Sequence, residues 1–306
     1  MVSCHRVPAF AETRLATGLM LGSNYVYMLM ASNSAGIGYS GTNGFMTMTS
    51  YEEWDSPSNG NWSVGMNWKD RSAPLPGVPN VLRFGGAVSD PAYFATNNLG
   101  TFKLNGLIFT NNSGGVTNVL AGNLLEFTNS GAMVEQWGAG SFIVSNMVNL
   151  TTGVTLRGSG TGTVVLATNL IGVGSVTKQG PWTLVLAGFN SFAGPVTVDS
   201  AGGTLRFDRP YGLGANSVTV SNGTVFANLG AMAYTNGNGA VQTTLVTGAA
   251  SLWTNSAGFA LANGRMTVTN GGSLFGAGNS YVGINGADSA VIAAGVTPMI
   301  INWLRS

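Results

Sequence analysis

The chain has 306 residues and 44% of them are hydrophobic, so it can bury a sizeable core, which argues against global disorder. Only 8% are Asp, Glu, Lys or Arg, against about 25% in an average soluble domain, and 46 are glycine. A net charge of +1 argues against nucleic acid and anionic membranes, which require clustered basic residues. The single cysteine, Cys4, excludes a disulfide framework. We therefore predict no nucleic-acid partner, no cofactor and no metal, since His5 is the only histidine.

Residues 1–45 form the first segment. Arg6 and Arg14 precede an apolar stretch at 15–31, and small residues follow around Ala35. Basic, apolar and small residues in this order are typical of an export signal, but polar residues interrupt the apolar stretch. The segment is predicted to be either an export signal or an irregular N-terminal segment, and it is too short and too polar for a good membrane-spanning helix.

Residues 46–90 form a tryptophan-rich opening or cap region. Three carboxylates flank one tryptophan, and two more tryptophans follow: Glu52, Glu53, Asp55, Trp54, Trp62 and Trp68. Carboxylates beside tryptophans suggest sugar binding or glycoside hydrolysis. The alternative is a polar loop whose tryptophans cap the first coil of a repeat domain. The spacing defines no catalytic pair, which favours the cap.

Residues 91–296 alternate apolar and polar side chains in short runs, which predicts β-strands. The clearest runs lie at 102–109, 124–127, 154–156, 164–166, 184–186, 218–220 and 266–268. Asn-Gly pairs between runs, as at 222–223, predict tight turns because both residues tolerate positive φ. No window of a dozen residues has helical periodicity.

These runs repeat. The segment from Val246 aligns without a gap to the segment from Val268, at a spacing of about 22 residues. A period of this length with two or three short strands predicts an all-β fold, a parallel β-helix or β-solenoid with coils of about 22 residues. We expect inward apolar ladders and outward ladders of Thr, Ser and Asn, since stacked like charges would repel each other. Residues 297–306 are predicted to be a C-terminal tail or a weak cap.

Residues 174–207 resemble the autotransporter-associated β-strand repeat of bacterial surface and secreted proteins. The motifs are Ser175-Val176-Thr177-Lys178-Gln179-Gly180, Gly188-Phe189-Asn190-Ser191-Phe192-Ala193-Gly194, Val196-Thr197-Val198 and Gly203-Thr204-Leu205. Residues 246–295 are similar to a second repeat of the same large proteins, through VTGAASLWTNS and TVTNGGS. The tryptophan-rich segment from Trp54 is similar to the opening that precedes such repeats.

The resemblance implies a right-handed parallel β-helix on the passenger side of a secretion system. It implies a location outside the cell or at the surface or outer membrane of a Gram-negative-type bacterium. The partners it suggests are surface polysaccharides or other cell-surface proteins. We expect no integral membrane barrel within these residues, because a barrel needs many amphipathic strands of about 10 residues.

One charged cluster is the candidate catalytic site if the chain is an enzyme: Asp199, Arg206, Asp208 and Arg209. The alternative is a solvated salt bridge in a loop. The other acidic residues are predicted not to recur at coil spacing with basic partners. Lys178 and Asp199 are predicted to be isolated charges at turns.

Three functions are consistent with these patterns. The first is a non-catalytic, exported or cell-surface β-helical module with a structural or adhesin-like role. The second is a carbohydrate-active β-helix enzyme, a polysaccharide lyase or hydrolase. The third is a structural matrix protein that self-associates end to end.

Overall fold

The computed structural model describes residues 24–28, 30–34, 36–46, 51–85, 92–209, 217–227, 242–257, 260–261, 264–282, 290–294 and 300–303. The chain divides into two compact units, Met1–Ser50 and Tyr51–Ser306.

The first unit contains two antiparallel strand pairs. Strand β1 (Asn24–Tyr27) pairs with β4 (Asn43–Met46), and β2 (Met30–Asn33) pairs with β3 (Gly36–Tyr39). Large apolar side chains such as Val26, Met30 and Tyr39 are exposed. The basic part of the predicted export signal, residues 1–23, lies outside the described residues.

The second unit consists of parallel strands that belong to three faces of a stack of coils. The first face contains β5 (Glu52–Glu53), β7 (Asn80–Phe84), residues 106–109 of β9 (Phe102–Phe109), β12 (Ala132–Gln136), β15 (Val154–Arg157), β18 (Val176–Lys178), the first half of β20 (Val196–Phe207), the first half of β21 (Ser217–Ala227), β22 (Gln242–Thr247), β25 (Gly264–Thr269) and β27 (Ala290–Ala294).

The second face follows the same order along the chain. It contains β6 (Gly60–Asn61), β8 (Phe94–Asn97), β10 (Thr117–Gly122), β13 (Ser141–Val144), β16 (Thr163–Leu166), β19 (Thr183–Leu186), the second halves of β20 and β21, β23 (Ser251–Asn255), the start of β26 (Ser273–Val282) and β28 (Ile300–Trp303). The third face contains the start of β9, β11 (Leu125–Phe127), β14 (Val148–Leu150) and β17 (Leu170–Gly172). Strand β24 (Ala260–Leu261) pairs with the end of β26.

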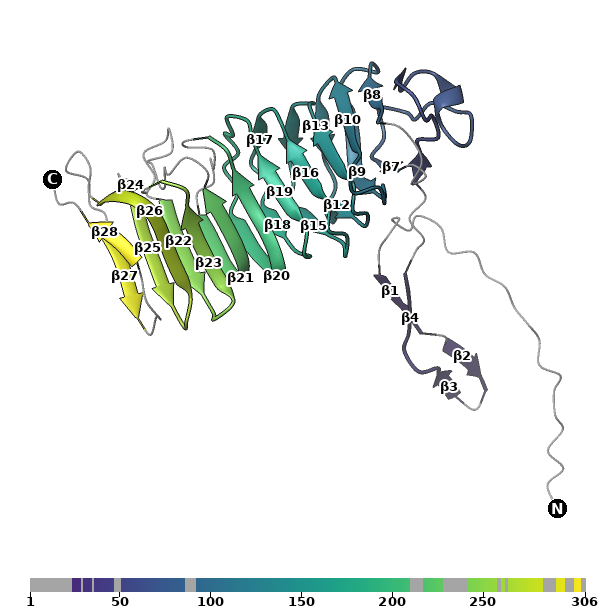
Figure 1. Ribbon diagram of the computed structural model, residues 1–306. Helices are drawn as coiled ribbons and strands as arrows, with labels where there is room; N and C mark the ends of the chain where they lie inside the picture. The colour runs from purple at the N-terminus through teal and green to yellow at the C-terminus, as the bar shows by residue number, and fades with distance from the viewer. Residues whose placement is uncertain are drawn as a thin grey trace. The chain divides into compact units, whose positions relative to one another are not determined.

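Successive strands of a face lie side by side in one row, from β7 to β28 (Figure 1). One coil therefore crosses the faces in turn and returns to the first face beside its own start, about 22 residues later. The predicted all-β solenoid with coils of about 22 residues is confirmed. The only helix in the described part of the chain is a single 3-10 turn, η1 (Gly65–Asn67).

Alternation of side chains within each strand creates the core. In the first half of β21, Val218 and Val220 are buried and their neighbours are partly exposed. In the second half, Gly223, Val225 and Ala227 are buried. The inward residues stack in register along the first face: Val134, Leu156, Lys178, Val198, Val220, Val246 and Val268. All seven are buried. Burial of each apolar member contributes roughly 1.5–3 kcal/mol before the entropy cost of ordering the chain.

The core contains a small apolar cavity of about 30 Å³. Its lining comes from consecutive coils and has no polar surface: Leu107, Phe109, Phe127, Val134, Val144, Val148, Leu150, Val154, Leu156, Val164, Leu166, Leu170, Val176 and Leu184. The cavity therefore follows the inside of the stack between β9 and β19.

Tight corners connect the faces and require glycine at specific places. Gly158 has φ +121°, and a Cβ atom there would lie 2.1 Å from the carbonyl oxygen of Gln136 in the preceding coil. At another corner, asparagines of successive coils contact each other: Asn123 Nδ2 donates to Asn97 O at 3.0 Å, and Asn146 Nδ2 donates to Asn123 O at 2.7 Å. These side-chain amides add to the backbone hydrogen bond that Asn123 N donates to Asn97 O, so that the corner ties consecutive coils together.

The outward side chains of the second face form two rows. Thr163, Thr183, Thr204 and Thr224 are register partners, and we call them the hydroxyl row. Two residues further along each strand lies the outer apolar row: Phe94, Val119, Ile143, Val165, Val185, Arg206, Phe226, Thr254 and Phe275. The predicted outward ladder of Thr, Ser and Asn therefore describes the first of these rows but not the second, where most side chains are apolar.

Candidate functional site

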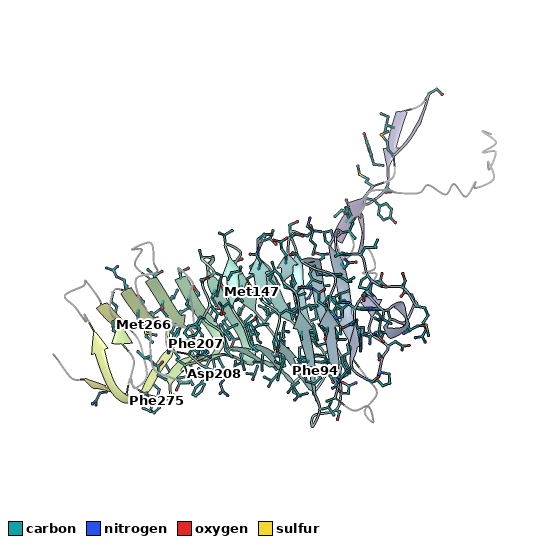
Figure 2. The ribbon with its side chains drawn as sticks, turned by 90° about the horizontal axis from the view of Figure 1, so that it is seen from above. Phe94, Met147, Phe207, Asp208, Met266 and Phe275 are labelled. Atoms are coloured by element: carbon teal, nitrogen blue, oxygen red, sulfur yellow. The ribbon has the colours of Figure 1, made fainter. Side chains whose placement is uncertain are left out.

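Three of the four predicted site residues lie together at the C-terminal end of β20. The Nε atom of Arg206 donates to Oδ1 of Asp208 at 2.5 Å, and both side chains are partly exposed. Arg209 follows directly and donates from Nε to the carbonyl oxygen of Ala187 at 2.9 Å. Phe207, between the two arginines, is buried in the core, and Figure 2 labels it beside Asp208.

Asp199 does not join this group. It lies in the first half of β20, opposite Asn222 of β21, whereas Arg206 belongs to the second half. The register shifts between residues 199 and 204, where the strand passes from the first face to the second. Within the described part of the chain, no ion pair connects Asp199 to Arg206, Asp208 or Arg209. Asp199 therefore belongs to the first face, whereas Asp208 follows the part of β20 that belongs to the second face.

Each arginine of the group covers a phenylalanine ring. The Cζ atom of Arg206 lies 5.9 Å from the ring centroid of Phe226, its register partner in the next coil. The Cζ atom of Arg209 lies 4.6 Å from the ring centroid of Phe189, in the preceding coil. The two guanidinium groups therefore extend along the stack in opposite directions, and cation–π attraction holds each of them.

The charge of this surface is positive. Arg206 is the one charged residue within the described strands of the second face. Asp208 offsets one of the two guanidinium charges. Both arginines use Nε for their hydrogen bonds, and among the described residues their Nη atoms donate to no partner. The group can therefore bind an anion through planar, paired N–H donors.

The tryptophan-rich region forms a core instead of an open sugar platform. Trp54, Trp62 and Trp68 are buried, and the Trp62 ring meets Trp68 and Phe102 edge-on at centroid distances of 6.0 and 5.1 Å. Trp68 Nε1 donates to the carbonyl oxygen of Trp62 at 2.9 Å. Strands β5 and β6 pair with β7 and β8, so these rings lie inside the first coils.

The carboxylates around Trp54 have separate partners. Glu53 lies 2.7 Å from Lys69 and 3.5 Å from Arg83, and Asp55 lies 3.2 Å from Arg71. Partial burial raises the pKa of Glu52, and the neighbouring carboxyl of Asp70 raises it further. These ion pairs are exposed or half-exposed, which makes each of them a small contribution to stability.

The prediction that Lys178 is an isolated charge at a turn is wrong. Its side chain is fully buried in the inward ladder of the first face, between Leu156 and Val198. The Nζ atom donates to the carbonyl oxygens of Gln179 at 3.0 Å and Gly180 at 2.9 Å. Burial lowers the pKa of Lys178 to about 7. The alignment of Thr155-Leu156 with Thr177-Lys178 at coil spacing was the signal in the sequence that places this lysine inside.

The prediction that no other acid recurs at coil spacing with a basic partner was wrong. Glu135 and Arg157 are register partners in β12 and β15, and Arg157 Nε lies 2.7 Å from Glu135 Oε1. Glu135 also accepts a 2.8 Å hydrogen bond from Trp137 Nε1. Glu135 is buried under these contacts, so this pair braces two coils and is not an open site.

Among the residues that the structure describes, no group of three or more His, Cys, Asp or Glu is placed to hold a metal ion. No helix in the described ranges has the length and apolar composition needed to cross a membrane. The chain matches no protein-family model, no curated protein and no solved structure.

Proposed function

We propose that this chain is a non-catalytic β-solenoid module that is exported or displayed at the surface of a bacterial cell. Its role is structural and adhesin-like, and it acts through the side chains presented by its stacked coils. The observation that carries the proposal is the register of the second face, where outward residues form continuous rows over many coils. Such rows present the same chemistry repeatedly, which suits recognition of an extended partner.

The arrangement of the candidate catalytic residues supports this proposal over the enzyme alternative. Asp208 is held by Arg206, and Asp199 lies on the other side of the bend in β20. Glycoside hydrolysis requires two carboxyl groups on either side of one bond. In the described residues, Asp208 pairs with Arg206, and Glu53 and Asp55 beside the buried tryptophans pair with basic residues, which favours a structural role for these carboxylates.

Two measurements test the proposal. The purified chain should release no oligosaccharides in a depolymerisation screen over neutral, carboxylated and sulfated polysaccharides. Activity that disappears in Asp199→Ala and Asp208→Ala variants would establish the enzyme instead. In the producing bacterium, antibodies against the chain should label intact cells or detect it in the medium. Labelling only after lysis would contradict export and surface display.

A further inference from the structure

We propose that Arg206 and Arg209, together with Phe226 and Phe189, bind the acidic groups of a linear polysaccharide that lies along the second face. The inference rests on the proposed function, because it assigns a ligand class to the surface through which the module is proposed to act. The shared chemistry of the ligand is an anionic group, carboxylate or sulfate, on a chain of sugar rings.

Charge complementarity is the first reason. The strands of the second face, as far as the structure describes them, carry no charge other than that of Arg206. Arg209 lies three residues further, and Asp208 neutralises one of the two cations. The excess positive charge is therefore concentrated at one place on an otherwise neutral surface. A guanidinium group with unoccupied Nη donors matches the planar oxygen pairs of a carboxylate or sulfate.

Preorganisation is the second reason. Each guanidinium is held by a ring on one face and by a hydrogen bond from Nε. The rotamer freedom of these long side chains is thus restricted before a ligand arrives, which reduces the entropy cost of binding. The Arg206 guanidinium lies over Phe226 of the next coil, and the Arg209 guanidinium lies over Phe189 of the preceding coil. The two cations therefore point toward different coils of the stack.

The neighbouring rows fit sugar rings. The hydroxyl row places Thr204 and Thr224 beside Arg206 and Phe226 on the same strands, and these hydroxyl groups can exchange hydrogen bonds with sugar hydroxyls. Phe189, which lies under Arg209, is 63% exposed and offers an apolar surface for the C–H face of a ring. Phe94, Asp208 and Phe275 lie along one side of the stack in Figure 2, so a chain along that side would pass the group.

A nucleic acid is the less suitable occupant. Binding to a phosphate backbone at physiological salt uses on the order of 6–10 basic contacts, and this surface offers two arginines with one compensating aspartate. A neutral glycan would offer the Nη donors only uncharged oxygens, whereas hydrogen bonds to charged groups are the stronger kind. The favoured class is therefore a polysaccharide with spaced acidic groups.

The test measures binding of the purified chain by isothermal titration calorimetry. The probes are polygalacturonate for carboxylate groups, chondroitin sulfate for sulfate groups, neutral dextran, and a single-stranded oligonucleotide. We expect at least one acidic polysaccharide to bind, with an affinity that falls as salt increases. The double variant Arg206→Gln/Arg209→Gln should weaken binding by about tenfold or more, since hydrogen bonds to charged groups are the stronger kind.

Arg157→Gln is the control for loss of an arginine elsewhere, because it removes one positive charge from the first face, where Arg157 pairs with Glu135. It should bind the acidic probe like the parent chain, and circular dichroism should show that all variants are folded. The inference would be overturned if the double variant bound the acidic probe as tightly as the parent chain. It would also be overturned if the control weakened binding as much as the double variant, or if dextran or the oligonucleotide bound as tightly as the acidic polysaccharide. Failure to bind any acidic polysaccharide would also overturn it but would leave the proposed function intact, because that function is tested by depolymerisation and cell labelling.

Discussion

The ammonium group of Lys178 lies 4.2 Å from the ring centroid of Trp182, and both side chains are completely buried inside the stack. The two residues come from opposite sides of the corner between β18 and β19. The lysine donates to two carbonyl oxygens of that corner, and Trp182 Nε1 donates to the carbonyl oxygen of Arg157 in the preceding coil at 3.2 Å. No acidic side chain contacts this ammonium group in the described part of the chain, so the carbonyl oxygens and the ring provide its surroundings.

The stability of the fold should therefore depend on pH above neutrality. The pKa of Lys178 is about 7 in the folded chain and 10.5 as the ordinary value. Between these values the unfolded chain binds a proton that the folded chain does not, so the free energy of unfolding should rise with pH. The expected rise is about 1 kcal/mol for each pH unit between about pH 7 and about pH 10. Urea denaturation at several pH values measures this slope.

Lys178→Met should remove the slope, because methionine fills a similar space and does not titrate. Lys103→Met is the control: Lys103 is exposed on the third face, and its loss should leave the slope unchanged. A parent chain whose urea midpoint is flat across this pH range would contradict the prediction.

Trp62→Ala should destabilise the first coils by about 3–5 kcal/mol, because it empties a large buried space between Trp68 and Phe102. Hydrogen exchange should show lost protection in β5 to β9 and retained protection in β16 to β19. Trp137→Ala is the comparison, since Trp137 is 48% exposed, and it should cost far less. Similar losses in the two variants would show that Trp62 does not close the core.

Gly158→Ala should destabilise the chain by about 3 kcal/mol or more. It combines a left-handed backbone with a collision against the carbonyl oxygen of Gln136. Gly131→Ala tests the backbone effect alone, because Gly131 has φ +80° and no atom within 4 Å of the added Cβ; it should cost about 1 kcal/mol. The difference between the two urea midpoints measures the cost of the collision with the preceding coil. Equal midpoints would show that this collision contributes nothing to the loss of stability.

Val164→Ile should stabilise the chain by up to about 0.8 kcal/mol, because the added methyl group extends toward the apolar cavity of about 30 Å³. Val198→Ile is the matched control: Val198 is equally buried but does not line the cavity, and overpacking there should be destabilising. Thermal denaturation compares the two. A lower melting temperature for Val164→Ile would mean that the cavity cannot accept the group.

Much of the fold could be predicted because its signals are local. Alternation in runs such as 218–220 predicts strands, and the spacing between Val246 and Val268 predicts the coil. The distribution of strands over faces could not be predicted. The passage of β20 through a bend into a second face depends on pairing with β18, β19 and β21, which are separate segments of the chain.

The candidate site was predictable only in part, because some of its contacts depend on pairing between separate segments of the chain. Arg206, Asp208 and Arg209 are close in sequence, so their grouping follows from the chain itself. Phe226 and Phe189 join them through the register of three coils, about 20 residues in each direction. Lys178 shows the opposite case: residue type suggested a surface position, whereas alignment with Leu156 in the preceding coil indicates the core.

The parallel register has a consequence for how the length of this molecule can change. Each coil contacts the coils before and after it through equivalent positions, such as Thr155, Thr177 and Thr197 on the first face. Removal or duplication of one whole coil would join equivalent positions again and preserve every ladder. Loss of one residue within a strand would instead turn the inward side chains of that strand outward. Descendants of this sequence should therefore differ in length by multiples of a coil, with single insertions confined to the corners.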